Sequence, residues 1–111
     1  MKEEIIELIK DKLSEITKLS FEDRHFHLKY YVDAILENIV KLINISDNEE
    51  EKQSYKFIWD RLNHTNEKEV EFAKRAYDKA KKKNAAKIRE TEYNLSLRKA
   101  IRQIDVDLAL L

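Results

Sequence analysis

Apolar residues recur at steps of three and four positions along most of this chain, as they do in helices that bury one face. In the first segment, the positions that share such a face are Ile5, Leu8, Ile9, Leu13, Ile16 and Leu19. We therefore predict a helix over residues 2–19. Ser20 and Asp23 have nearly the pattern of a capping box, which predicts that a second helix, over residues 21–45, starts after a short turn. Apolar positions cover much of the girth of this helix, so we expect it to be central.

Polar interruptions divide the rest of the chain. A short polar run predicts a turn and, after it, a third helix over residues 48–62. A second polar run, residues 63–66, ends in Asn66, which is a good N-cap for a fourth helix over residues 67–110. Because neither Gly nor Pro is present, we expect this long helix to be continuous or gently kinked. The alternative is a break near residues 91–96, where polar residues offer a new cap.

The apolar face changes sides within this fourth segment. One sector contains Val70, Ala73, Tyr77, Ala80, Asn84, Ile88 and Leu95. A second sector contains Leu97, Ile101, Ile104, Leu108 and Leu111. In a straight helix the two sectors lie roughly 150° apart, at about 100° per residue. A continuous helix would therefore present its second face to another subunit or to a partner.

Composition narrows the fold class. The 111 residues suit one domain, so we expect a single helical domain over residues 1–111. With 42% hydrophobic and 40% charged residues, the chain can form a core and stay well solvated. The absence of Gly, Pro and Cys excludes Gly-rich phosphate loops, disulfides and thiolate metal sites. We predict an all-α bundle of about four helices with a long C-terminal helix that is continuous or gently kinked.

Few residues suggest catalysis or metal binding. Glu22 and His25 have the Glu-x-x-His spacing of di-metal helical bundles, but this chain holds one copy and such a centre needs two. No serine has the strand-turn-helix setting of a nucleophile. We therefore expect neither an enzyme nor a metal or other cofactor. The sequence shows neither an export signal nor a membrane segment, so we expect a cytoplasmic protein.

The charges are unevenly distributed, although the chain is neutral in sum. Residues 1–73 carry 17 acidic and 11 basic side chains, whereas residues 74–111 carry 5 acidic and 11 basic ones. A contact with phosphate or with an acidic protein surface would use this excess. Nucleic-acid binding is the weaker alternative, because Lys predominates over Arg and the net charge is zero. The basic residues that would form either contact are Lys74, Arg75, Lys79, Lys81, Lys82, Lys83, Lys87 and Arg89.

Aromatic residues outside the main apolar faces complete the sequence-based prediction. Phe57 and Phe72 both fall away from the expected core stripes, and large apolar side chains in such places often mark interfaces. The predicted interface comprises Phe57, Phe72, Leu97, Ile101, Ile104, Leu108 and Leu111. We expect a non-catalytic interaction protein that forms a homodimer, binds a protein partner, or does both, and acts as an adaptor, regulator or inhibitor. A phage or mobile-element origin suits its composition, which is rich in Ile, Lys and Asn.

Overall fold

The computed structural model describes residues 1–82 and 87–111, and every regular element in that part is helical. The elements are α1 (Lys2–Ile16), α2 (Leu28–Ile45), α3 (Glu49–Thr65), the π-helix η1 (Asn66–Val70), α4 (Glu71–Lys82) and α5 (Lys87–Leu108). Since α3, η1 and α4 follow one another without a gap, they form one rod over residues 49–82, which we call the long helix. The predicted all-α bundle of about four helices is thereby confirmed, and its last helix spans 22 residues.

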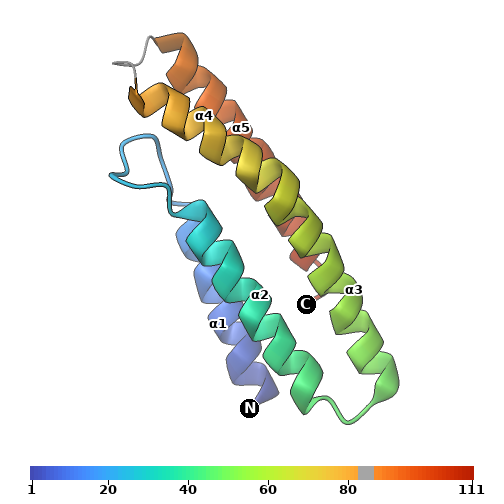
Figure 1. The fold of residues 1–111 in the computed structure, drawn as a ribbon. Coiled ribbons are helices and arrows are strands. Elements are labelled where there is room, and N and C mark those ends of the chain that lie inside the picture. The colour runs from blue at the N-terminus through green and yellow to red at the C-terminus, as the bar shows by residue number, and fades with distance from the viewer. Residues whose placement is uncertain (83–86) are drawn as a thin grey trace.

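The helices alternate in direction along an elongated molecule (Figure 1). The principal extents are 52 × 21 × 17 Å. α1 packs on α2, and α2 packs on the α3 part of the long helix, while α5 runs back beside α4 and reaches α3. α2 contacts α1, α3 and η1, as expected for the central helix. One cluster of buried apolar side chains includes residues from α1, α2, the long helix and α5.

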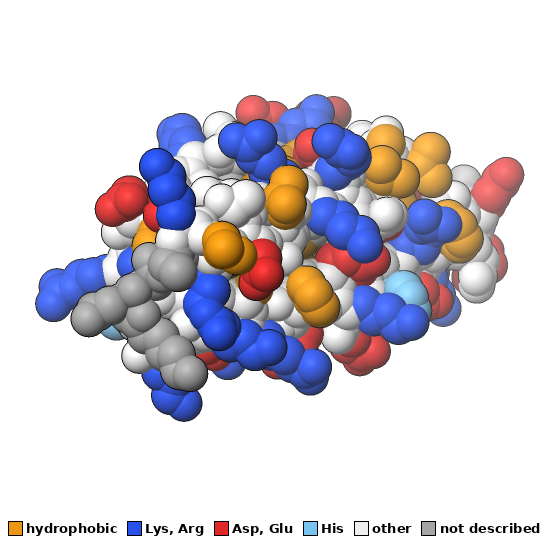
Figure 2. Space-filling model, turned by 90° about the horizontal axis from the view of Figure 1, so that it is seen from above, with side chains coloured by type: hydrophobic (Ala, Val, Ile, Leu, Met, Phe, Trp, Pro, Cys, Tyr) orange, Lys and Arg blue, Asp and Glu red, His pale blue; other side chains and the backbone are white. Residues whose placement is uncertain are grey.

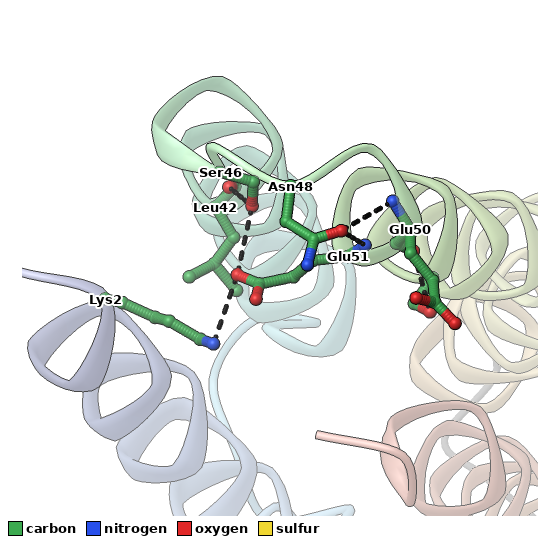
Figure 3. Close-up of polar contacts among 7 residues, drawn as sticks. Lys2, Leu42, Ser46, Asn48, Glu50 and Glu51 are labelled. Carbon is green, nitrogen blue, oxygen red and sulfur yellow. Dashed lines mark hydrogen bonds and ion pairs between the residues drawn. The ribbon is translucent and has the colours of Figure 1, made fainter.

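The turn between α2 and α3 is held by caps and an ion pair (Figure 3). The Asn48 side-chain oxygen accepts hydrogen bonds from the backbone N–H groups of Glu50 and Glu51, at 2.8 and 3.3 Å. Glu51 also pairs with Lys2 at 3.1 Å, which fastens the start of α1 to the start of α3. The hydrogen bond from Lys2 holds the pKa of Glu51 below its usual value. Asn48 is therefore the N-cap of the long helix.

The predicted start of the second helix at residue 21 is wrong. α1 ends at Ile16 and α2 begins at Leu28, with turns and irregular backbone between them. The Ser20 N–H does donate to Asp23 Oδ2, at 2.8 Å, but no helix follows this local bond. We call residues 17–27 the connecting segment.

Long-range aromatic packing explains why the connecting segment is not helical. The Phe21 and Phe26 rings lie 5.7–6.4 Å from the rings of Tyr77 on α4 and Tyr93 on α5. The Tyr77 hydroxyl donates to the backbone oxygen of Asp23, at 2.6 Å. Burying this aromatic surface stabilises the irregular conformation more than local helix formation would.

The predicted break at residues 63–66 is also wrong, and Asn66 is not an N-cap. The backbone remains helical there, and Asn66 is 5% exposed. Its amide nitrogen donates to Asp33 Oδ1 on α2, at 2.9 Å, while the neighbouring Thr65 hydroxyl donates to Asp107 on α5. Because these polar side chains find partners on other helices, the rod can bury them and continue.

The predicted single helix over residues 67–110 is replaced by two antiparallel helices. Its first part belongs to the long helix, which ends at Lys82, and α5 begins at Lys87. The alternative break near residues 91–96 falls inside α5 and is wrong as well. Two antiparallel helices that each turn a face to one core account for the change in apolar face, so no second subunit is needed to explain it.

Candidate protein-interaction surface

A groove follows the seam between the long helix and α5. It consists of four hollows with volumes of 320 to 530 Å³, and each hollow shares at least one lining residue with the next. Phe57 and Leu110 line the end near the start of α3. Glu69 joins the middle hollows, and Phe72 and Leu95 line the end near α4. We call this surface the long groove.

Large apolar side chains along the long groove are exposed to solvent. The exposed fractions are 53% for Phe57, 64% for Phe72, 65% for Leu95 and 74% for Leu110. Figure 2 shows hydrophobic side chains set among many Lys and Arg side chains on one face of the molecule. Apolar surface in a groove with a charged rim is typical of sites that bind another polypeptide.

The two ends of the long groove carry opposite charge. Toward the start of α3, it is lined by the acidic residues Glu50, Asp60 and Asp107 and by one basic residue, Arg61. Toward α4, the basic residues lining it are Lys68, Arg75, Lys79 and Lys99. Glu92 is the one acidic residue of that end, and Glu69 lies at the middle. A partner that matches both ends must itself change from basic to acidic along its length.

A buried carboxylate fixes the floor of the groove. The Asp107 side chain is 1% exposed, and its oxygens accept hydrogen bonds from Thr65 and, at 3.1 Å, from Gln103. Arg61 lies 3.5 Å from the same carboxylate. A buried charge is tolerated only when such partners replace its hydration. This network therefore holds α5 in a defined position along the long helix.

The π-helix sets the direction in which the groove aromatics point. Glu50 and Phe57 are seven residues apart, as are Phe72 and Lys79, so each pair shares one side of its helix. Fifteen residues separate Phe57 from Phe72, one more than two heptads. A π-turn takes up about one extra residue in a helix, and η1 lies between them. Both aromatic side chains consequently border the same groove.

Aromatic packing fixes the basic end of the molecule. The Tyr77 and Tyr93 rings are 5.2 Å apart and are covered by the connecting segment. Burial, reinforced by the negative charge of Asp23, raises the pKa of Tyr93 to about 12. The Lys81 ammonium lies 4.3 Å from the Phe21 ring centroid, a cation–π contact.

The structure divides the predicted apolar interface. Phe57 and Phe72 are exposed in the groove, as described above. Leu97, Ile104 and Leu108 are only 4%, 0% and 6% exposed, because α5 turns this face to the core of its own chain. Ile101 and Leu111 are half-buried against that core. The proposal that these five residues form an exposed docking face is therefore wrong.

The predicted basic face is not one continuous surface. Arg75, Lys79 and Lys82 are exposed and share one side of α4, where Arg75 and Lys79 also line the long groove. Lys81 lies over Phe21, as noted, and Lys74 lies 3.9 Å from Asp78. On α5, Lys87 is exposed and Arg89 is half-buried. Lys83 lies outside the residues that the structure describes.

The sequence did not predict the burial of several residues on α5 or the buried polar contact between α3 and α5. Leu95 and Ile88 were placed with the core, but they are 65% and 71% exposed, while Tyr93 is 2% exposed. The spacing of the buried face of α5 was a usable signal, since it recurs at steps of three and four through Tyr93, Leu97, Ala100, Ile104 and Leu108. The Thr65–Asp107 contact joins residues 42 positions apart, and no local sequence pattern predicts it.

Comparisons with protein-family models, with curated proteins and with solved structures find no match to this chain. Within residues 1–82 and 87–111, no helix has both the length and the hydrophobicity needed to cross a membrane.

Proposed function

We propose that this protein is a non-catalytic interaction module of the cytoplasm, which binds another polypeptide in the long groove. The observation that carries the proposal is the row of exposed apolar side chains, Phe57, Phe72 and Leu95, along the seam of two packed helices. Removing such apolar surface from water on binding stabilises the complex by about 25 cal/mol per Å². Bound in this way, the module would act as an adaptor, regulator or inhibitor of its partner.

The charged rim supports the same proposal. Opposite charges at the two ends of the groove select the direction in which a partner lies, and they speed association at low salt. The buried network around Asp107 and the packing of Tyr77 on Tyr93 hold the walls of the groove in place. A rigid groove loses little conformational entropy when it binds.

The test uses a photo-reactive amino acid at Phe72. A benzoylphenylalanine at this position in the groove should crosslink to the polypeptide that binds there, whereas the same group at Tyr30, which is 67% exposed on α2, should not. The crosslinked protein is then identified by mass spectrometry, purified and titrated against the wild type and the Phe72→Ser variant. We expect Phe72→Ser to weaken binding at least about tenfold, as is usual for a buried aromatic anchor. Equal crosslinking at both positions, or an unchanged affinity, would refute the proposal.

Nucleic-acid binding is the second candidate, favoured by the exposed row Arg75, Lys79 and Lys82 on α4. It predicts binding to duplex DNA whose logarithmic affinity falls linearly with the logarithm of the salt concentration. The double variant Lys79→Glu with Lys82→Glu should then abolish that binding. Under the interaction-module proposal, we expect no saturable binding to a short duplex at 150 mM salt, measured by fluorescence anisotropy.

A further inference from the structure

We infer that the polypeptide that covers the long groove is a second copy of this chain, packed antiparallel about a twofold axis that crosses the long helix near His64. The inference rests on the proposed function, because it uses the same groove, and it adds the identity and the orientation of the partner. A twofold interface is self-complementary and closes after two copies.

The spacing of the groove residues supports this axis. Phe57 and Phe72 lie at equal distances from the midpoint between residues 64 and 65, at about 11 Å each for a rise of 1.5 Å per residue. Glu50 and Lys79 lie at equal distances from the same point, at about 22 Å each. A twofold rotation therefore places Phe57 against Phe72 of the partner subunit and Glu50 against Lys79 of the partner subunit. Two ring pairs and two ion pairs form at once.

Near the axis, opposite charges meet only along diagonals. The rotation places Asp60 opposite Glu69 of the partner subunit and Arg61 opposite Lys68 of the partner subunit, so that Arg61 is diagonal to Glu69 of the partner subunit. The Oε2 atom of Glu69 is shielded from solvent and has no hydrogen-bond partner among the described residues. Such a buried acceptor is costly unless a donor reaches it. The Nε atom of Arg61 faces Asp107 of its own chain, at 3.5 Å, so the terminal N–H groups of Arg61 of the partner subunit would supply that donor along the diagonal.

A parallel arrangement lacks this complementarity. In a parallel pair, the acidic end of one groove lies against the acidic end of the other, and the basic ends repel in the same way. A different protein that binds the groove must therefore compete with the second copy.

Single cysteines test both the axis and the orientation, since the chain has no cysteine of its own. Gln53 and Ala76 line opposite ends of the groove and are equidistant from the proposed axis. In the antiparallel dimer, residue 53 of one copy lies beside residue 76 of the other, while the two copies of residue 53 are about 34 Å apart, at 1.5 Å per residue. A short bismaleimide should therefore join a mixture of Gln53→Cys and Ala76→Cys but neither variant alone. His64→Cys, close to the axis, should crosslink to itself.

Solution mass completes the experiment. Light scattering of the wild type across a concentration series should approach twice the chain mass of 13.3 kDa. The variant Phe72→Ser should raise the dissociation constant at least about tenfold with an unchanged circular dichroism spectrum, because the side chain is 64% exposed. A wild type that stays monomeric up to 0.5 mM, or efficient crosslinking of Gln53→Cys alone, would overturn the inference. If a different protein is then captured by the photo-reactive group at Phe72 and binds in titration, the proposed function stands without the dimer. If the chain forms no dimer and no other protein is captured, both the inferred dimer and the proposed function are refuted.

Discussion

Replacing Ile104 by Ala tests whether this residue lies in the core of the chain or at an interface with a partner. Ile104 is 0% exposed and belongs to the central apolar cluster, although its spacing in the sequence suits an outward-facing stripe. The change removes three carbon atoms, which corresponds to about 2.4 kcal/mol at about 0.8 kcal/mol per buried methylene. The cavity left behind adds to this loss, so we expect a total of about 3–4 kcal/mol. Total stability for a chain of this size is about 5–15 kcal/mol, so the variant should be severely weakened.

Urea unfolding followed by circular dichroism at 222 nm measures this effect. With a slope of about 1–3 kcal/mol per molar urea, the unfolding midpoint should fall by about 1–4 M. Val106→Ala in the same helix is the control, because Val106 is 55% exposed and its loss should change stability by less than about 0.5 kcal/mol. Two protein concentrations are compared, so that any contribution of association to stability is recognised. An unchanged midpoint together with a loss of association would refute the assignment of Ile104 to the core and restore the C-terminal face as an interface.

Three further predictions concern single interactions. Asp107→Ala removes the buried carboxylate that accepts hydrogen bonds from Thr65 and Gln103 and pairs with Arg61, and should lower stability by about 1–3 kcal/mol in urea unfolding. An unchanged midpoint would show that the network does not hold α5. Asn48→Ala removes the cap of the long helix and should lower stability by about 1 kcal/mol, with Asn44→Ala as a control in the exposed part of α2. The raised pKa of Tyr93 makes the folded chain keep a proton that the unfolded chain loses, so stability should fall as the pH rises from about 10 to about 12. Tyr93→Phe should flatten this pH profile, and an equally steep fall in the variant would contradict the assignment.

The periodicity of the sequence predicted the helices that depend on local signals. α1 and α2 both lie within the predicted ranges, and the start of α3 is capped by Asn48. Two predicted boundaries failed where a distant contact overrides the local signal. The pair Ser20 and Asp23 forms its hydrogen bond without starting a helix, and Asn66 is held inside a helix by Asp33.

The candidate groove was partly visible in the sequence. Phe57 and Phe72 stood out because they fall off the core stripes, and both line the groove. Leu95 did not stand out, because its place on the helix surface was worked out for a helix assumed to run unbroken from residue 67. The basic residues were recognised as a group, yet only their placement on α4 separates Arg75 and Lys79, which line the groove, from Lys81, which covers Phe21.

The sequence by itself determined that this chain is helical, which side of each helix is apolar, and that acidic and basic residues fall in different halves. These properties follow from the order of neighbouring residues, since helix geometry and capping act over only a few positions. Tertiary structure alone decided that the apolar face of α5 lies in the core, that the π-helix brings Phe57 and Phe72 to one groove, and that Asp107 meets Thr65. These outcomes depend on where the chain turns back and on contacts between distant residues, whose free energy exceeds the small local preferences that a sequence pattern records.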